Sequence, residues 1–368
     1  MSRILHVRNS DIFGSPERLI IGQCLHIKEF DWVVATFVRN GGMNRFAEES
    51  ARAGIETFAI PETRVADTQI IKQLRRIVKE RNIEMVISHD YKASLVSWIA
   101  TRGLGTSLVA IYHGVTLEDA KVRLYNAVDT LMLKKMRRVI AVSEYTRRHL
   151  MSRGIREKRI VVVPNAIDAT TLSPSAPSKE PLGSRPLRLV AAGRFSREKG
   201  FDILLDALAR AKDTAPPFRL FLYGKGPEET NLRKMVESLA LTEIVEFGGF
   251  VDDIAPVFRT MDMLVMTSRS EGMPLIILEA WRERLGVVAT AVGGIPEMIE
   301  SGANGILIQS TETSAISEAL VSAMNNAEAV AEYGRRGFEL LKSTYNYEKQ
   351  SACLAAVYRE TLAERKKR

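Results

Sequence analysis

The sequence has little cysteine and no long apolar run, and each absence excludes a class of protein. Its two cysteines, Cys24 and Cys353, lie far apart, with no CxxC spacing and no histidine cluster around them. A disulfide framework and a zinc site are therefore not indicated, and we expect both cysteines to be buried thiols. No apolar run approaches the roughly 20 residues that a membrane-spanning helix needs. The segment Met1 to His6 lacks the basic and apolar regions of a signal peptide, so we expect a cytoplasmic protein.

Positive charge is in excess over the chain as a whole. Its 368 residues carry a formal net charge of +8. Such an excess suits nucleic acid or an anionic membrane surface, and a solvated basic surface without a partner is the alternative. Single-stranded nucleic acid would need exposed aromatic side chains among the basic residues, and the sequence has no such cluster. We therefore expect no nucleic-acid partner.

Short apolar runs alternate with helical patterns along the chain, which is long enough for two domains. The runs are apolar on both faces, as buried parallel strands are. This alternation predicts an α/β fold with parallel sheets covered by helices on both faces. The predicted strands are Arg3–Val7, Trp32–Phe37, Glu56–Ile60, Met85–Ser88, Ser107–Tyr112, Val139–Val142, Ile160–Val163, Leu187–Ala192, Phe218–Tyr223, Val245–Phe247, Met263–Thr267, Val287–Ala291 and Gly305–Ile308.

A stretch rich in serine and proline, from Ala169 to Arg185, separates the strands into two sets. We predict an N-terminal Rossmann-like domain over residues 1–170, a linker over 171–186 and a second Rossmann-like domain over 187–345. The helical pattern at 346–368 either packs back on the N-terminal domain or frays into solvent. Ligands of doubly wound sheets bind beyond the carboxyl ends of the strands, so the loops there should carry the chemistry.

A basic loop follows the predicted strand Leu187–Ala192. Gly193 permits a tight turn and the close approach of a ligand, and Arg194 and Lys199 bring two cations to a helix N-terminus. This arrangement suits a diphosphate, which the planar fork of an arginine and the point charge of a lysine can grip together. The spacing is not that of a P-loop. A solvated basic loop is the alternative.

Two glutamates follow the predicted strand Met263–Thr267. Glu271 lies in the loop, and Glu279 lies about two turns further along, inside the next helix. Gly272 marks the turn, and Pro274 fits the first turn of that helix. The two carboxylates could hold two hydroxyl-bearing parts of one ligand. The alternative is a charge that complements the helix dipole and an exposed helix residue.

Together these segments resemble glycosyltransferase family 4, the retaining nucleotide-sugar glycosyltransferases of the GT-B fold. The resemblance implies two doubly wound Rossmann-like domains that face a central cleft. Seven motifs carry it, in the family's order. They are AVSE at Ala141–Glu144, PNAID at Pro164–Asp168, GRFSREKG at Gly193–Gly200, YGKGPE at Tyr223–Glu228, FGGF at Phe247–Phe250, SEGMPLIILE at Ser270–Glu279 and VVATAVGGIPE at Val287–Glu297.

The resemblance implies a role for each motif position in the second domain. Arg194 and Lys199 would hold the donor diphosphate, and Glu271 would contact sugar hydroxyls beside the anomeric carbon. Glu279 would hold the ribose hydroxyls. The remaining donor-binding positions lie in the glycine turns and beside the nucleotide base. Others lie at the N-terminus of a helix, whose amides would stabilise the departing phosphate. These positions are Gly193, Gly224, Gly249, Phe250, Gly272, Met273, Pro274 and Leu275.

In the first domain the resemblance points to His113, which follows the strand Ser107–Tyr112, as a catalytic histidine near the transferred sugar. A histidine satisfied within its own loop is the alternative. Gly14 would belong to a loop that faces the phosphates and the acceptor, although Ser15 stands where the family usually has a second glycine. His89 follows another strand end and could touch the acceptor. Three further histidines lie outside these loops and are expected to be structural: His6, His26 and His149.

Two departures affect these expectations. Large residues, Trp281, Arg282 and Arg284, replace the small ones that usually follow Glu279, so we expect unusual helix packing or a partner surface there. The chain also has no D-x-D motif, the pair with which metal-dependent glycosyltransferases hold a metal. We therefore expect no metal and no cofactor, with a nucleotide-diphosphate sugar as donor substrate. The adjacent pair Asp252-Asp253 is expected to start a helix.

The function implied by the resemblance is transfer of a hexosyl group, with retention, to a glycan or lipid-linked acceptor in cell-envelope polysaccharide or lipopolysaccharide synthesis. A nucleotide-sugar epimerase of the same fold and a catalytically silent binding module are the alternatives. The segment Lys121–Arg138 interleaves basic and apolar residues, which suggests peripheral contact with the inner face of the cell membrane. A basic helix packed on its own domain is the other interpretation.

Overall fold

The structure is a computed structural model that describes residues 1–10, 13–39, 42–63, 67–114, 120–169 and 184–366. The chain forms two compact units. The first contains Met1–Gly114, most of the chain from there to Ala166, and the C-terminal segment from Tyr347, and the second contains Ile167–Asn346. The domain boundaries predicted from the sequence lie at residues 170 and 345. The predicted linker, 171–186, lies almost entirely outside the described residues.

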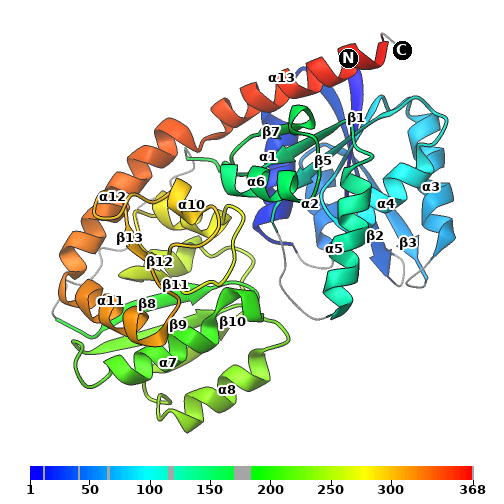
Figure 1. Ribbon diagram of the computed structural model, residues 1–368. Coiled ribbons are helices and arrows are strands. Elements are labelled where there is room, and N and C mark those ends of the chain that lie inside the picture. The colour runs from blue at the N-terminus through cyan, green and yellow to red at the C-terminus, as the bar shows by residue number, and fades with distance from the viewer. Residues whose placement is uncertain (11–12, 40–41, 64–66, 115–119, 170–183, 367–368) are drawn as a thin grey trace. The chain divides into compact units, whose positions relative to one another are not determined.

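Seven parallel strands form the sheet of the first unit, in the order β3-β2-β1-β4-β5-β6-β7 (Figure 1). The central strands are mostly apolar and buried because helices cover both faces. The direction of winding reverses between β1 and β4, and ligands of doubly wound sheets bind at such a switch point. The strands are β1 Ser2–Arg8, β2 Phe30–Arg39, β3 Glu56–Glu62, β4 Met85–Ser88, β5 Ser107–Tyr112, β6 Arg138–Ala141 and β7 Ile160–Val162.

Several helices of the first unit begin at polar caps. Asp67 accepts a hydrogen bond from the Gln69 N–H at 2.9 Å and Asp90 accepts one from the Ala93 N–H at 2.8 Å, each of which satisfies an amide that the helix itself leaves unpaired. No helix in the described ranges is long and apolar enough to cross a membrane. The helices are α1 Ser15–His26, α2 Arg45–Arg52, α3 Thr68–Glu80, α4 Tyr91–Ala100, α5 Ala120–Leu133, α6 Glu144–Ser152, the 3-10 helix η1 Glu157–Arg159 and α13 Tyr347–Lys366.

The C-terminal helix α13 packs on the first unit. The Tyr347 ring stacks on His26 with 4.5 Å between ring centroids, and Gln350 Nε2 donates to the Pro164 carbonyl at 2.7 Å. Cys24 is buried, but Cys353 is exposed. The expectation of two buried thiols was therefore wrong for Cys353, because only one side of α13 packs against the unit.

The second unit is built on a six-stranded parallel sheet, in the order β10-β9-β8-β11-β12-β13, with a switch point between β8 and β11. Every predicted strand occurs in the structure, with its ends moved by one or two residues at most. The predicted α/β fold with two doubly wound parallel sheets is confirmed. The strands are β8 Leu187–Ala192, β9 Phe218–Tyr223, β10 Val245–Gly249, β11 Met263–Met266, β12 Gly286–Thr290 and β13 Ile306–Ile308.

Helices also cover the second sheet, and a large apolar cluster fills the space between them. At the start of α9, Asp253 accepts a hydrogen bond from the Ala255 N–H at 3.1 Å, as expected of a residue at a helix start. The helices are η2 Arg197–Lys199, α7 Phe201–Ala211, α8 Glu229–Ser238, α9 Ala255–Phe258, α10 Leu275–Arg282, η3 Ile295–Glu297, α11 Thr313–Asn325 and α12 Ala327–Thr344.

Of the large residues after Glu279, Trp281 belongs to the core, whereas Arg282 is half-buried and Arg284 is exposed. Trp281 is fully buried, and Gly337 on α12 lies so close to its indole that a Cβ at Gly337 would lie 2.3 Å from a ring carbon. The Arg284 guanidinium lies 4.3 Å from the centroid of the Phe338 ring. Unusual packing, rather than a partner surface, therefore accounts for Trp281.

We expect Gly337→Ala to destabilise the protein, although glycine to alanine inside a helix normally stabilises by about 0.5–1 kcal/mol. The added methyl would overlap the Trp281 indole, and overpacking of this kind costs about 1–3 kcal/mol. Chemical denaturation would measure the free energy of unfolding. The double variant Gly337→Ala/Trp281→Leu should be less destabilised than the sum of the two single variants, and strict additivity would contradict the packing argument.

Candidate functional site

Two glycine turns meet at the carboxyl end of β8. Gly193 follows the strand with a φ of 153°, and its N–H donates to the Tyr223 carbonyl at 2.9 Å. Gly224, with a φ of 144°, lies so close that a Cβ there would be 1.8 Å from the Gly193 carbonyl oxygen. Gly224 can therefore carry no side chain, and the two predicted ligand-binding turns are packed backbone to backbone.

The loop after β8 is joined to the loop after β11. Gly200 has a φ of 67°, and a Cβ there would lie 2.0 Å from the Thr267 carbonyl oxygen. The Thr267 hydroxyl in turn donates to the Gly200 carbonyl at 2.8 Å. Lys199 Nζ reaches Glu271 Oε1 at 2.7 Å, across 72 positions of sequence. The structure thus brings together two site residues that the sequence analysis had assigned separately.

Glu271 is only 8% exposed, and its position is fixed on several sides. The Ser268 hydroxyl donates at 2.7 Å to the same carboxylate oxygen that Lys199 contacts. Gly293 has a φ of 61° and presses on the Glu271 backbone, so that a Cβ there would lie 1.8 Å from the Glu271 carbonyl oxygen. The sequence analysis gave no role to Ser268 or Gly293. The double glycine of the VVATAVGGIPE segment was the available signal for Gly293.

Arg194 differs from Lys199 in its surroundings. Its side chain is exposed and forms no hydrogen bond or ion pair with a residue that the structure describes. The guanidinium is therefore open to solvent, and its binding to an anionic ligand stays a prediction.

The helix after Glu271 begins one residue later than predicted. Pro274, with a ψ of 118°, is the residue that precedes α10, and Leu275 is its first helical residue. Pro274 does not lie in the first turn, because its extended ψ ends the loop. Glu279 is 5% exposed, so the alternative of an exposed helix carboxylate was wrong. Glu279 therefore lies in the interior of the unit, and its role in ligand binding stays a prediction.

The end of β10 offers an open, aromatic surface. Gly249 has a φ of 71° and nothing within 4 Å of an added Cβ. The next residue, Phe250, is 41% exposed, and Lys225 Nζ lies 4.5 Å from its ring centroid. A large exposed ring beside a cation suits the flat face of a nucleotide base.

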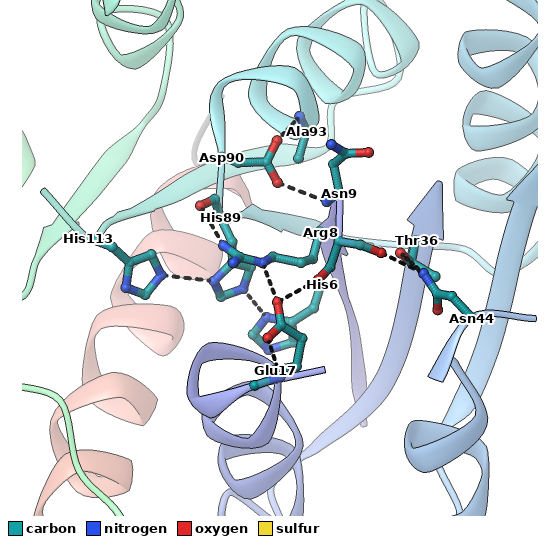
Figure 2. A network of polar contacts seen from close by, with 12 residues as sticks. His6, Arg8, Asn9, Glu17, Thr36, Asn44, His89, Asp90, Ala93 and His113 are labelled. Carbon is teal, nitrogen blue, oxygen red and sulfur yellow. Dashed lines mark hydrogen bonds and ion pairs between the residues drawn. The ribbon is translucent and has the colours of Figure 1, made fainter. Parts of the chain in front are cut away.

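In the first unit, a polar network occupies the carboxyl ends of β1 and β4 (Figure 2). Glu17 on α1 is buried, and its carboxylate accepts hydrogen bonds from Arg8 Nε at 2.9 Å, the Ser10 hydroxyl at 2.8 Å and the Gly14 N–H at 3.0 Å. The backbone of Gly14 is extended, with a φ of −142°. The segment from Gly14 to Glu17 was predicted from the sequence to form a ligand-facing loop, whereas no role was predicted for Arg8.

Asp90 ties the network to α4. Its two carboxylate oxygens accept from the Asn9 N–H and the Ala93 N–H, both at 2.8 Å. Burial raises the pKa of Asp90, against the opposing effect of Arg8 and of these amides. On α5, burial and then the charge of Asp90 raise the pKa of Asp129 to about 6. Asp129 is therefore a second carboxyl near the switch point that the sequence analysis missed.

Three histidines form a chain across the same strand ends. His6 Nδ1 lies 2.8 Å from His89 Nε2, and His89 Nδ1 lies 3.5 Å from His113 Nε2. Burial lowers the pKa of both His6 and His113 to about 3. Burial, and then the charges of His6, His113 and Arg8, lower the pKa of His89 well below its ordinary value. All three imidazoles are therefore neutral at pH 7, and His6, expected to be structural, is the buried end of the chain.

The neutral state fixes the direction of the chain. Each contact needs one protonated and one bare ring nitrogen. His6 Nε2 is buried without a partner among the described residues, and an unpaired buried N–H is costly, so we assign the His6 proton to Nδ1. His6 then donates to His89, His89 donates through Nδ1 to His113 Nε2, and His113 carries its proton on Nδ1. His113 would thus offer a donor, rather than an acceptor, at Nδ1.

The histidines should make the protein sensitive to acid. A neutral buried histidine resists protonation when folded but gains a proton near its ordinary pKa of 6.5 when unfolded, so stability falls as the pH drops from 6.5 toward about 3. The slope is about 1.4 kcal/mol per pH unit for each such group. We therefore expect the stability advantage of the wild type over His113→Asn to shrink between pH 6.5 and 4.5, a range set from these pKa values.

Urea denaturation at each pH would measure that difference. Asp90 and Asp129 have the opposite effect on the pH dependence of stability, because their raised pKa values favour the folded state at low pH. Their effect is the same in the wild type and in His113→Asn, so it cancels in the difference between the two proteins. A difference that does not change with pH would show that folding does not lower the pKa of His113.

Comparisons with known proteins agree with this geometry. The model of the family described as Glycosyltransferase Family 4 matches residues 19–171, and the model described as Glycosyl transferases group 1 matches residues 186–326. The chain belongs to glycosyltransferase family 4. Its two doubly wound sheets are those of the GT-B fold. The structure describes no group of three or more His, Cys, Asp or Glu side chains that could hold a metal ion.

Several curated relatives are glycosyltransferases. The lipopolysaccharide core biosynthesis glycosyltransferase LpsE of Rhizobium meliloti is 30% identical over 160 residues, which are 44% of this chain and 46% of LpsE. WcaL of Escherichia coli, proposed to act in colanic acid biosynthesis, is 26% identical over 250 residues, or 65% of this chain and 61% of WcaL. This chain therefore spans less than two thirds of either relative. A GDP-mannose-dependent phosphatidylinositol monomannoside mannosyltransferase of Mycolicibacterium smegmatis is 25% identical and matches 85% of this chain and 86% of its own.

Solved structures share the fold. The Anabaena protein HepE, in complex with UDP and glucose, has a TM-score of 0.85 at 21% identity, over 98% of this chain and all of that one. Sucrose-phosphate synthase from Thermosynechococcus elongatus has a TM-score of 0.83 at 16% identity, over 99% of this chain and all of that one.

Proposed function

We propose that this protein is a retaining glycosyltransferase that moves a hexosyl group from a nucleotide-diphosphate sugar to a glycan or lipid-linked acceptor in cell-envelope polysaccharide or lipopolysaccharide synthesis. The observation that carries the proposal is the pair of Lys199 and Glu271, which places a cation of the phosphate loop beside a buried carboxylate. The names of the relatives support the reaction class and the polysaccharide pathway. HepE, which binds UDP and glucose, supports the donor class.

The residues suit a reaction on one face of the sugar. Arg194 and Lys199 would neutralise the diphosphate while the bond between the anomeric carbon and the phosphate oxygen breaks. The acceptor oxygen would bond to the same face of that carbon, and its proton would pass to the departing phosphate oxygen. Lys199 and Ser268 already engage one oxygen of Glu271, so this carboxylate suits hydrogen bonds to sugar hydroxyls better than attack on carbon. No covalent enzyme intermediate is then required.

The buried Glu279 would hold the ribose hydroxyls, and the amides at the start of α10 would face the phosphate. We further propose that these cations and amides neutralise the leaving group without a metal, and that the protein uses no cofactor. Transfer that continues unchanged with EDTA would support this part of the proposal, and loss of transfer that Mg²⁺ or Mn²⁺ restores would overturn it.

The donor can be found by thermal shift. UDP, GDP, ADP and TDP, each with its sugars and without metal, would be added to the wild type, since a ligand that binds only the folded state raises the melting temperature. The nucleotide that shifts the wild type would then be used to resolve the anomer of the product by NMR. Inverted product would overturn retention, and the absence of a shift with every nucleotide would favour a catalytically silent module.

We further propose that the protein works in the cytoplasm and contacts the inner face of the cell membrane. In the segment Lys121–Arg138, Leu131 and Lys134 are exposed, which supports such a contact. Arg137 and Arg138, however, form ion pairs with Glu364 on α13, and Met132 and Leu133 are buried, so only part of the segment is available. Flotation with anionic liposomes should show binding that salt weakens, and no binding at low salt would remove the membrane contact.

A further inference from the structure

A basic cavity lies in the first unit, at the amino ends of the strands, whereas the histidine chain lies at their carboxyl ends. Its volume is about 880 Å³. Its walls include Ser107 and Arg138, the first residues of β5 and β6, together with Arg156 just before η1 and two residues within η1. His113, in contrast, follows the last residue of β5. The cavity is therefore distinct from the candidate site at the carboxyl ends of these strands.

The charge of the cavity is unusual. Its lining contains seven cationic side chains and a single carboxylate, Glu364. That is a formal excess of six positive charges, which accounts for most of the net charge of +8 on the whole chain. The cationic residues are Arg102, Lys135, Arg137, Arg138, Arg156, Lys158 and Arg159.

Only two of the seven cations have an anionic partner in the parts of the chain that the structure describes. Arg138 forms ion pairs with Glu360 and Glu364 of α13, and Arg137 lies 3.8 Å from the Glu364 carboxylate. The remaining five form no ion pair with a described residue. Cations gathered in one recess repel one another, so an anion in the cavity would stabilise the folded protein.

Some of the lining is held in place without a carboxylate. Arg159 donates to the carbonyl oxygens of Lys134 at 2.8 Å and Met136 at 3.3 Å, and the Arg102 guanidinium lies 5.1 Å from the centroid of the Trp98 ring. In the wall, the buried Ser107 hydroxyl has no hydrogen-bond partner among the described residues. The cavity thus combines arginines held by carbonyl and ring contacts, lysine point charges and a hydroxyl without a described partner, a set that matches phosphate oxygens.

We propose that this cavity binds a compact ligand that carries two or more phosphate groups. Five cations that form no ion pair with a described residue exceed what one phosphate needs, and a recess favours a compact anion over an extended chain. A nucleic acid is a poor match, because the one indole in the lining, Trp98, is covered by Arg102. A soluble polyphosphate and a phospholipid headgroup with two phosphates share the required chemistry, and the experiment separates these two sources.

The test compares charge-reversed variants in the full-length protein. Arg156→Glu/Lys158→Glu reverses two exposed cations of the cavity that form no ion pair with a described residue. The control, Lys28→Glu/Arg148→Glu, makes the same change of charge at exposed positions of the first unit that do not line the cavity. All proteins would also carry Lys199→Ala, which weakens phosphate binding at the candidate donor site. Melting temperatures would confirm that the variants are folded.

Inorganic tripolyphosphate would be titrated into each protein in a calorimeter at fixed ionic strength. We expect the Kd to rise about tenfold or more in the cavity variant, a loss of about 1.4 kcal/mol, and to rise much less in the control. In a second arm, phosphatidylcholine vesicles with and without cardiolipin would be sedimented with each protein. Binding only to cardiolipin vesicles, lost in the cavity variant alone, would identify a lipid headgroup as the source.

Equal weakening in the cavity variant and the control would show attraction to overall positive charge and would overturn the proposal. So would the absence of binding to both tripolyphosphate and cardiolipin vesicles.

Discussion

Replacing Lys199 with alanine is expected to lower kcat/KM for the sugar donor by about 10²–10³-fold, the usual effect of removing one preorganised charge from a reacting centre. The proposed role of Lys199 is to neutralise the diphosphate as it leaves. We therefore expect a lower kcat and a smaller change in KM, because the negative charge on the leaving group grows in the transition state. Initial rates over a range of donor concentrations would separate kcat from KM.

Two further variants distinguish this role from a structural one. Lys234→Ala removes an exposed lysine of α8 with no ion pair in the described chain, and it should leave both constants unchanged. In the double variant Lys199→Ala/Glu271→Gln the effects should not add, because Lys199 and Glu271 contact each other at 2.7 Å. A kcat/KM for Lys199→Ala close to that of the wild type would remove Lys199 from the proposed mechanism.

The sequence predicts the strands of this protein well, and for a physical reason. A parallel strand covered by helices on both faces is a continuous apolar run, and Met85–Ser88 and Ser107–Tyr112 were both predicted to the residue. The motif resemblance then located Lys199 and Glu271, each of which lies in the segment between such a strand and the following helix. Their contact across 72 positions follows only from the pairing of β8 with β11, which no local pattern contains.

The sequence does not predict the contacts that the topology of the sheets creates between distant segments. His6 and His89 are 83 positions apart and meet because β1 pairs with β4. His6 could therefore not be distinguished from a structural histidine in a strand. Cys353 was wrongly expected to be buried because the apolar pattern of α13 does not reveal which side meets α1. The basic cavity is hidden for the same reason, since its lining comes from separate segments.

Gly293→Ala is expected to damage both stability and activity. At a φ of 61°, an alanine costs about 1–2 kcal/mol relative to glycine. Its Cβ would also lie 1.8 Å from the Glu271 carbonyl oxygen and 3.0 Å from the Glu271 nitrogen, so the backbone of the loop that carries Glu271 has to move. Such overpacking adds about 1–3 kcal/mol of destabilisation. Because a shift of about 1 Å in a reacting group can cost about 10²-fold in rate, kcat should fall as well.

Gly302→Ala is the matched control for this prediction. Gly302 also has a left-handed backbone, with a φ of 83°, but nothing lies within 4 Å of an added Cβ. The variant Gly302→Ala should therefore lose only the stability that the left-handed backbone costs an alanine, about 1–2 kcal/mol, and should keep its activity. Denaturation curves and initial rates on the two variants separate backbone strain from displacement of Glu271. If Gly293→Ala lost no more stability than Gly302→Ala and kept its kcat, the close contact between Gly293 and Glu271 would not be what holds the carboxylate in place.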